Sequence, residues 1–270
     1  MVSKVAVVGL EHGATQAFKE ALKLIGKIDD LNTSKRSVVV KVGIFDPKGT
    51  HHTSVDVAEA IVNSFNKAPQ VYIAESDNYR GTASDRLQKW KTLFSKRVVP
   101  FSLSEDLDTK QVKIADENIA LSHILFKPNV LVSTHVLRTY EQGSVLKNLL
   151  GLIPDKKKAR FHKKLAKTLI DAYEAIGGID LAVLDGTHIA LSVTQKGKRV
   201  PANVLVVGRD ALAVEVVGAA LVGLKPEKVP VIREAIGRGI GEGDINRIDI
   251  VGTSIEDLGE KFHQLLAHEK

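Results

Sequence analysis

The stretch SVVVKVGI, residues 37–44, indicates the fold class, because it is a short run of mostly β-branched residues followed by turn chemistry. Such a run predicts a buried strand. Residues 46–49 (DPKG) then have the composition of a turn. Apolar residues over 55–65 recur at helical spacing, and Gln70–Ala74 predicts the next strand. This strand–helix–strand order is typical of a parallel sheet.

The same alternation continues on both sides of this unit. Short apolar runs predict further strands at Val5–Gly9, Val130–Thr134, Ile179–Leu184, Asn203–Val207 and Ile248–Val251. Helical periodicity predicts helices at Thr15–Ile25, Ser84–Phe94, Lys156–Ile176, Ala211–Gly223, Pro226–Arg238 and Ile255–His268. We therefore expect an α/β fold, with a largely parallel or mixed sheet that is flanked by helices.

The chain has 270 residues, which is enough for one large domain. Its pattern predicts a single α/β domain over residues 1–270. The segment Ser104–Asn118 is polar and charged, which is typical of a hairpin or a surface insertion. We therefore expect a smaller lobe inserted at about residues 95–130.

Composition excludes several classes of protein. The chain has no cysteine, so it forms no disulfide and carries no cysteine-ligated iron–sulfur cluster. Its longest apolar run, Ala211–Leu224, is interrupted by Glu215 and glycines, which argues against a membrane span. The N-terminus lacks the pattern of a signal peptide, which predicts a cytoplasmic protein. The net charge of +6 favours anionic partners.

Polar residues follow four of the predicted strands. They are Lys41, the segment 133–135, the segment 185–187 and the segment 208–210. In open α/β sheets, ligands bind outside the carboxyl ends of the strands. This rule predicts that the four ends contribute to one site.

The strongest local pattern lies between residues 133 and 151. A predicted strand ends at His135, and a glycine turn then leads to Lys147 and Asn148. Backbone N–H groups of such a turn, together with Arg138 and Lys147, suit a phosphate or a carboxylate. The alternative is that these cations are solvated surface residues and His135 packs in a turn.

These residues also carry a resemblance to a known family. The order Thr134-His135, then LKNLLG at residues 146–151, then His162 resembles the hallmark of the domain-of-unknown-function 362 family. Further segments resemble the family pattern in the same order: Val38–Lys41, Leu181–Gly186, Gly208–Val214 and Gly237–Asp244. The resemblance spans nearly the whole chain.

The chain departs from the family pattern in several ways. Ser133 stands where a lysine is usual, and Glu215 stands where an aspartate is usual. Many members carry cysteine-ligated clusters, so an electron-transfer role of this cysteine-free chain implies a separate redox partner protein. A looser similarity links the pattern to the lactate racemase family, in which a lysine of such a turn carries a nickel-pincer cofactor. That similarity is an analogy of fold.

Two further patterns could bind ligands. His51 and His52 are adjacent in a predicted loop and, with Asp210, or alternatively with Glu215 or His162, could hold a divalent metal. The alternatives are two plain loop histidines and a helix N-cap at Asp210. The basic run Lys156–Lys164 could bind nucleic acid, but aromatic residues are only 5% and no nucleic-acid module is visible, so a solvated basic rim is favoured.

The leading hypothesis is an enzyme that acts on a small anionic substrate or cofactor. Lys147, His162 and Asp185 are its candidate catalytic residues, as nucleophile or proton carriers and as the group that orients them. The candidate anion-binding residues are Lys41, His135, Arg138, Asn148 and Arg209. The second hypothesis is a non-enzymatic protein that binds or assembles a cofactor or metal, and the third is nucleic-acid binding. The sequence predicts neither a particular reaction nor an oligomeric state.

Overall fold

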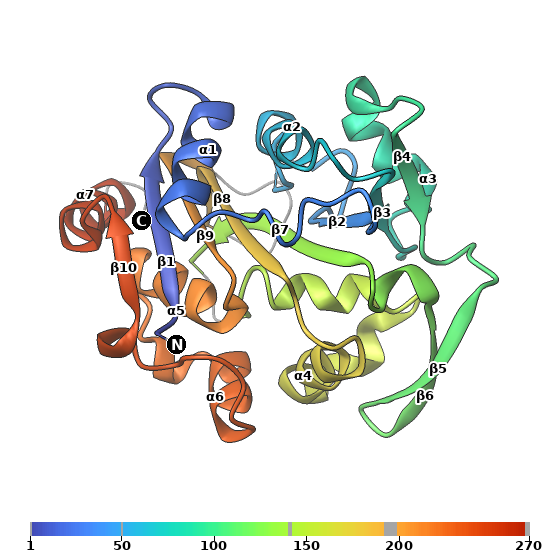
Figure 1. The fold of residues 1–270 in the computed structure, drawn as a ribbon. Coiled ribbons are helices and arrows are strands. Elements are labelled where there is room, and N and C mark those ends of the chain that lie inside the picture. Colours follow the sequence, from blue (N-terminus) through green and yellow to red (C-terminus); the bar gives the residue numbers. More distant parts are fainter. Residues whose placement is uncertain (1, 50, 140–141, 192–198, 268–270) are drawn as a thin grey trace.

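The computed structural model describes residues 2–49, 51–139, 142–191 and 199–267. Its central feature is an eight-stranded sheet, which crosses the middle of the molecule in Figure 1. The strands are β1 (Lys4–Gly9), β2 (Val38–Val42), β3 (Val71–Glu75), β4 (Val98–Ser102), β7 (Val130–Arg138), β8 (Leu181–Ala190), β9 (Arg199–Gly208) and β10 (Asp249–Gly252). Their order across the sheet is β10-β1-β9-β8-β7-β2-β3-β4.

The sheet is mostly parallel. β1 pairs in parallel with β10, β2 with both β3 and β7, β3 with β4, and β7 with β8. β9 pairs antiparallel with both of its neighbours, β1 and β8. This mixed sheet, flanked by helices, confirms the predicted α/β class.

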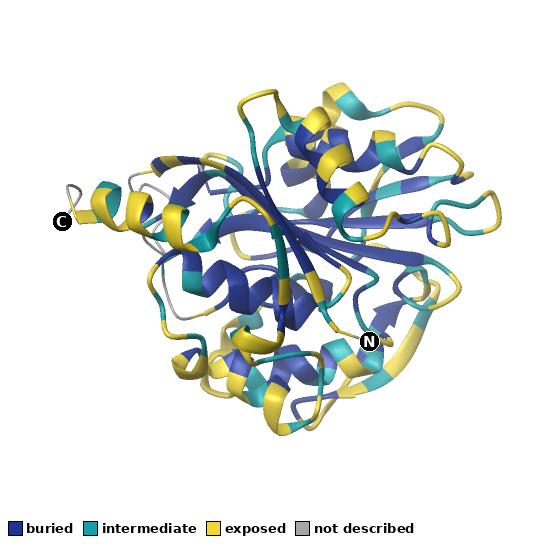
Figure 2. Cartoon of the chain, turned by 60° about the vertical axis from the view of Figure 1, so that its left-hand side comes forward, coloured by how far each residue is buried: buried dark blue, intermediate teal, exposed yellow. Residues whose placement is uncertain are grey.

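Helices cover both faces of the sheet. One face packs against α1 (Ala14–Leu24), α2 (Val55–Ser64), α3 (Ala83–Leu87) and the 3-10 helix η1 (Gln88–Leu93). The other face packs against α4 (Leu165–Ala175), α5 (Ala211–Leu221), α6 (Pro230–Gly237) and α7 (Ile255–Ala267). Figure 2 shows the buried residues running along the sheet and the inner sides of these helices.

Strand periodicity assigns side chains to the two faces. Val38 and Val40 belong to the apolar core under α1 and α2, whereas Val39 belongs to the core under α4 and α5. Successive side chains of a strand point to opposite faces, so both faces of a central strand must be apolar when helices cover both. This explains why β2 is an almost continuous run of valine.

The predicted inserted segment at about residues 95–130 divides into two parts. β4 joins the main sheet, whereas β5 (Thr109–Ile114) and β6 (Glu117–Ser122) form a separate antiparallel hairpin. The buried side chains Ile114, Ile119 and Leu121 of this hairpin belong to the same apolar core as α4. In Figure 1 the hairpin extends along the side of the molecule below β4.

Several predicted elements have different bounds in the structure. β8 continues past Leu184 to Ala190, because the residues after Asp185 keep pairing with β9 through a bulge. The predicted helix Lys156–Ile176 is divided into the 3-10 helix η4 (Lys158–Lys164) and α4, with Lys164 in a non-helical conformation. Both parts face one core, so the apolar spacing does not reveal the break. The predicted end of the last helix at His268 lies outside the described residues.

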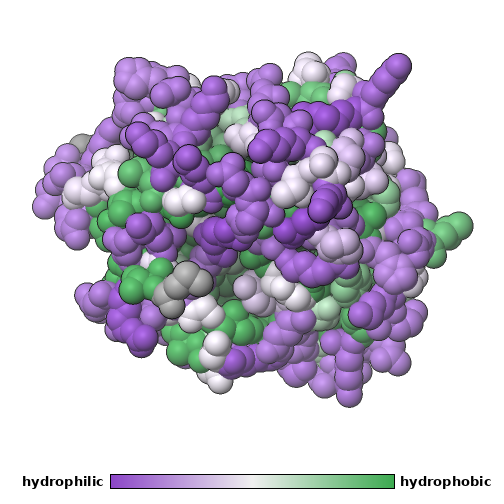
Figure 3. Space-filling model, viewed as in Figure 1, coloured by the Kyte–Doolittle hydropathy of each residue, from purple (hydrophilic) through white to green (hydrophobic). Residues whose placement is uncertain are grey.

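Among the described residues, no helix combines the length and the apolar character that a membrane crossing needs. On the face shown in Figure 3, hydrophilic side chains predominate and hydrophobic ones gather in smaller patches between them.

The antiparallel direction of β9 separates two predicted site residues from the others. β9 runs antiparallel to β8 and therefore opposite to β2 and β7 as well. Its carboxyl end therefore lies beside the amino ends of those strands, away from their carboxyl ends. The prediction that all four strand ends converge is therefore wrong for Arg209 and Asp210. Arg209 forms an exposed ion pair with Asp30, with 2.7 Å between Nη2 and Oδ2.

Asp210 is the N-cap of α5. Its Oδ1 accepts the backbone N–H groups of Leu212 (3.0 Å) and Ala213 (3.1 Å). Its Oδ2 accepts the hydroxyl of Ser3 (2.5 Å) and the N–H of Glu242 (2.8 Å). The carboxylate therefore has a full set of structural partners.

We predict that Asp210→Ala lowers the free energy of unfolding by about 1–2 kcal/mol, because the first-turn N–H groups of α5 lose their acceptor. Asp210→Asn should cost less, because its amide oxygen still accepts. Urea denaturation measures both values. A loss of anion affinity without a loss of stability would contradict the assignment of Asp210 as a cap.

Candidate functional site

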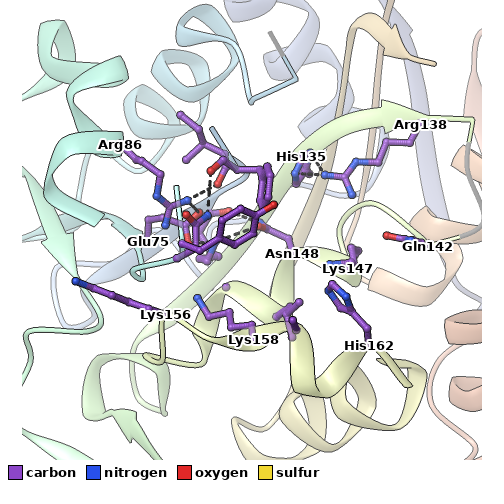
Figure 4. A pocket seen from close by; sticks show the side chains of 18 residues that line it. Glu75, Arg86, His135, Arg138, Gln142, Lys147, Asn148, Lys156, Lys158 and His162 are labelled. Atoms are coloured by element: carbon purple, nitrogen blue, oxygen red, sulfur yellow. Dashed lines mark hydrogen bonds and ion pairs between the residues drawn. The ribbon is translucent and has the colours of Figure 1, made fainter. Parts of the chain in front are cut away.

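A cavity of about 400 Å³ opens at the carboxyl ends of β2, β3 and β7. Figure 4 shows the side chains that line it. Among the described residues of this lining, six are lysine or arginine and one is a carboxylate, so this part of the lining is cationic. The charged and histidine side chains of the lining are Lys41, Glu75, Arg86, His135, Arg138, Lys147, Lys156, Lys158 and His162.

The carboxylate of Glu75 forms ion pairs with two buried cations at one side of the cavity. Its Oε1 lies 3.0 Å from Nζ of Lys41, and its Oε2 lies 3.6 Å from Nη1 of Arg86. All three side chains are buried. Burial lowers the pKa of Lys41 below its ordinary value, although Glu75 opposes the shift. The guanidinium of Arg86 also donates to the carbonyls of Ile44 and Ser76, so it ties β2 and β3 together beyond their ends.

Asn148 connects this ion cluster to the neighbouring strand. Its amide oxygen accepts from Nζ of Lys41 (3.0 Å), and its Nδ2 donates to the carbonyl oxygens of Lys41 (2.8 Å) and Thr134 (3.1 Å). Asn148 belongs to the 3-10 helix η3 (Lys147–Leu152). The amide therefore fixes η3 across the ends of β2 and β7, and it is a positioning residue whose own polar atoms are occupied.

Glycine permits the close approach of η3 to the ion cluster. A Cβ atom at Gly151 would lie 2.6 Å from Nζ of Lys41 and 2.8 Å from Oε1 of Glu75. A Cβ atom at Gly43 would lie 2.1 Å from the ring of His135. Both positions therefore require glycine for steric reasons.

Glu215 positions the loop that carries Lys147. It lies on α5, is buried, and accepts the backbone N–H groups of Ser144 (2.6 Å) and Leu146 (2.8 Å). Burial raises its pKa above the ordinary value, although these hydrogen bonds oppose the shift. Glu215 thus holds the backbone of this loop from the helical layer next to the cavity.

His135 is held in the neutral form. The N–H of Val136 donates to its Nδ1 at 2.7 Å, and the guanidinium of Arg138 also faces the ring. Burial, and then the charge of Arg138, lower its pKa well below the ordinary value. Because Nδ1 accepts the N–H of Val136, it carries no proton in this arrangement, and an imidazolium would lose this hydrogen bond. His135 is therefore a poor proton donor near neutral pH.

Among the described cations of the cavity, Lys147 is the one whose charge no neighbouring side chain or carbonyl group compensates. Its ammonium forms no hydrogen bond or ion pair with another residue in the described part of the chain. Burial, followed by the charges of Arg138, Lys158 and Lys41, lowers its pKa to about 7. Two neutral contacts hold Lys158, whose Nζ donates to Ser76 Oγ and to the carbonyl of Asp77 (2.6 Å each). Burial lowers the pKa of Lys158 to about 8.

His162 lies beside Lys147 in Figure 4 and is exposed at the cavity. Partial burial, and then the charge of Lys147, lower its pKa below the ordinary value. The structure thus brings six predicted site residues to one cavity, and they are Lys41, His135, Arg138, Lys147, Asn148 and His162.

Asp185 lies elsewhere, on the face of the sheet that α2 covers. Its Oδ2 accepts the N–H of Ser54, the N-cap of α2, at 2.6 Å, and its Oδ1 accepts the N–H of Thr187 at 2.9 Å. It is fully buried and is not among the residues that line the cavity. This position gives Asp185 a structural role in joining β8 to α2, rather than contact with a ligand in the cavity.

The predicted metal ligands do not come together. His51 and His52 lie near β8 on the α2 side, whereas Asp210 caps α5 at the other edge of the sheet. Within the described ranges, no three His, Asp or Glu side chains are grouped so that they could hold a metal ion. Instead, the buried rings of His51 and His188 lie 6.0 Å apart, and burial lowers the pKa of His188 to about 4.

The basic run after Pro154 divides between the cavity and the surface. Lys156 and Lys158 line the cavity. Arg160 pairs with Asp155 and Glu117, and Lys164 pairs with Asp116 on the β5–β6 hairpin. The hairpin therefore neutralises part of the surface charge of η4.

Sequence reasoning missed Glu75 and Arg86. Glu75 had a detectable signal, because it is an acidic residue directly after the apolar run of β3, at the same sheet edge as Lys41. Arg86 had none, since it lies within a predicted helix where a solvated side chain is the ordinary expectation.

We predict that Gly151→Ala lowers the free energy of unfolding by about 1–3 kcal/mol, because the added methyl group overlaps the Lys41–Glu75 pair. Gly259→Ala is the matched control. Gly259 lies inside α7 with open space at its Cβ position, so alanine there should stabilise the chain by up to about 1 kcal/mol. Equal effects of the two substitutions in urea denaturation would contradict the steric argument.

The buried histidines predict an acid-sensitive fold. Because burial keeps His188 neutral, the unfolded chain binds more protons than the folded chain between pH 6.5 and pH 4. The stability contributed by this group is complete above pH 6.5 and falls as the pH drops, by about 3 kcal/mol at most. His188→Gln should flatten this decline in a series of urea titrations, whereas His12→Gln at an exposed position should not. An unchanged slope in His188→Gln would argue against His188 as the source.

Comparisons with known proteins place the chain in a family. The search of curated proteins found no match. The sequence model of one family, described as a domain of unknown function (DUF362), matches residues 38–220. The matched region begins at β2 and ends within α5, and it includes all the cavity residues named above as well as Glu215. This match covers more than half of the 270 residues and confirms the resemblance seen in the sequence, so the chain belongs to the DUF362 family.

Proposed function

We propose that the cavity binds a small organic anion with a phosphate or carboxylate group, and that the protein is an enzyme that moves a proton on this ligand. The observation that carries the proposal is the charge of the described lining residues, which include six cations and one carboxylate, that of Glu75. Lys41 and Arg86 already share that carboxylate. Lys156 pairs with Asp77 at 3.4 Å. The charges of Arg138, Lys158 and Lys41 repel that of Lys147, and a bound anion would relieve this repulsion.

Lys147 is the centre of the proposed binding site. Its ammonium has no anionic partner among the described residues, and neighbouring cations contribute to its lowered pKa. An anion beside Lys147 would stabilise the charged form and raise the pKa again. Arg138 and Lys158 are close enough to influence this charge, so they would share in holding the ligand.

The same arrangement suits proton transfer. A lysine whose pKa is about 7 exchanges its proton readily near neutral pH. His162 is exposed at the cavity and can pass a proton between the site and water. We therefore assign Lys147 and His162 as candidate catalytic residues, and we give Asp185 a structural role.

The alternatives receive less support from the geometry. A metal carrier needs a ligand set, and the described residues offer none. Nucleic-acid binding through η4 needs free cations, but Arg160 and Lys164 already pair with carboxylates. A carrier of an organic anion shares the cavity with the proposed enzyme and differs from it only in the absence of turnover.

We predict that the affinity for sulfate falls as the pH rises through about 7, because Lys147 loses its charge there. Sulfate keeps its own charge across this range, so isothermal titration calorimetry from pH 6 to pH 9 measures the protein's titration. Lys147→Met should weaken binding by about 10-fold to 100-fold and remove the fall near pH 7. Lys158, with its pKa of about 8, would account for the remaining dependence.

Lys163→Met is the matched control for this experiment, because Lys163 is exposed on η4 and does not line the cavity. It should bind sulfate as the wild type does. Equal affinities of Lys147→Met and the wild type would contradict the assignment of Lys147.

Turnover separates the enzyme from the carrier. Organic anions that bind are incubated with the protein in D₂O, and incorporation of deuterium at carbon is followed by NMR. An enzyme that moves a proton should accelerate the exchange for its own ligand, and Lys147→Arg should abolish this acceleration while retaining a positive charge. Tight binding without exchange would favour the carrier.

A further inference from the structure

Two aromatic side chains line the cavity together with the cations. Phe45 lies on the loop between β2 and α2, and Tyr79 lies on the loop between β3 and α3. Their ring centroids are 5.2 Å apart with an interplanar angle of 71°, so the rings meet edge to face. This pair is called the aromatic shelf below.

The shelf is held in place although it is accessible to solvent. Nδ2 of Asn78 donates to the carbonyl of Phe45 at 2.9 Å, which joins the two loops directly beside the rings. Asn78 and Gly81 exchange backbone hydrogen bonds of 3.1 Å and 3.2 Å, so Tyr79 sits in a closed turn. Oδ1 of Asn78 also accepts the N–H of Arg80 at 2.8 Å. The side-chain amide of Asn78 therefore joins the backbones of the two loops that carry the rings.

Tyr79 is 68% exposed, whereas most large aromatic residues of a folded chain lose much of their surface. An exposed ring on a fixed turn retains apolar surface that a ligand can cover at little cost in conformational entropy. The guanidinium of Arg80 lies 5.1 Å from the centroid of the Tyr79 ring and accompanies it at the surface.

The cations reach the cavity from different elements. Lys147 and Lys158 come from η3 and η4, which follow β7, and Nζ of Lys158 reaches Ser76 and Asp77 on the loop that carries Tyr79. The shelf comes from the loops after β2 and β3. The cavity therefore presents aromatic rings and cations to the same space, and its volume of about 400 Å³ is within the range of pockets that hold whole cofactor-sized or drug-sized molecules.

We propose that the ligand is a flat, unsaturated ring compound that carries the anionic group. The phosphate or carboxylate would lie at Lys147 and its neighbouring cations, and the ring would pack against Phe45 and Tyr79. This inference rests on the proposed function and names the class of ligand for the same site.

Pairs of anions that differ only in the ring test the inference. Phenyl phosphate is compared with methyl phosphate, and benzoate with acetate, by calorimetric titration of the full chain. The ring should strengthen binding by about 3-fold to 10-fold in the pair whose anionic group the site prefers. The two pairs together show whether that group is a phosphate or a carboxylate.

Substitutions at Tyr79 separate the ring from the anion. Tyr79→Ala should remove most of the advantage of the ring compound and leave the affinity for methyl phosphate or acetate unchanged, whereas Tyr79→Phe should keep the advantage. Ile236→Ala removes another exposed apolar side chain, on α6, and serves as the matched control. Circular dichroism checks that each variant is folded.

The outcomes distinguish the two proposals. If the wild type binds the simple anions and the ring adds nothing, the aromatic shelf does not contact the ligand and only this inference is overturned. An unchanged ring preference in Tyr79→Ala also overturns it. If neither member of either pair binds at millimolar concentration, the proposed function fails and the inference fails with it.

Discussion

The pairing of Glu75 with Lys41 and Arg86 is the interaction on which the site depends. The buried carboxylate of Glu75, at the end of β3, pairs with Lys41 at the end of the neighbouring parallel strand β2 and with Arg86 of α3. Removing one member of such a cluster leaves a charge without compensation, which costs about 3–5 kcal/mol in a protein interior. The cluster therefore fixes the carboxyl ends of β2 and β3, and through Asn148 it also fixes η3. The cluster has two cations and one carboxylate, so its net charge is positive. This part of the cavity is therefore cationic even without the other lining residues.

Further cations lie near this cluster because the loops that follow parallel strands all begin at the same end of the sheet. The last residue of β7, Arg138, and the chain that follows it, with Lys147 and Lys158, lie at the end of the sheet where Lys41 also lies. Desolvation and mutual repulsion then act on Lys147 together and bring its pKa to about 7. The lowered pKa is thus a property of the assembled edge, since no residue adjacent to Lys147 in the sequence produces it. Glu215, from α5 on the helical layer behind, holds the backbone that presents this lysine.

The sheet also keeps two groups of ionisable residues apart. Side chains of a strand alternate between faces, so Asp185 and the neighbouring histidines His51 and His188 lie on the α2 side, and the cationic cavity opens on the other side of the strand ends. On the α2 side, the hydrogen bonds of Asp185 join β8 to the N-terminus of α2. The cavity, in contrast, retains a cation without a partner among the described residues and an aromatic ring that is largely exposed.

The sequence by itself determined the α/β class, most strands and helices, and six residues of the cavity, because these depend on local periodicity and on the rule that strand ends carry ligands. It also determined the family, since the order of the short segments from Val38 to Val214 is a property of the chain alone. Only the tertiary structure decided which strand ends meet. The direction of a strand depends on the neighbours with which it pairs, so the residues Arg199–Gly208 do not themselves indicate that β9 is antiparallel. For the same reason they do not indicate that Arg209 and Asp210 lie at the opposite end of the strands from the cavity. In the same way, the burial of Arg86, the structural position of Asp185 and the aromatic shelf arise from contacts between residues distant in sequence, which local patterns do not encode.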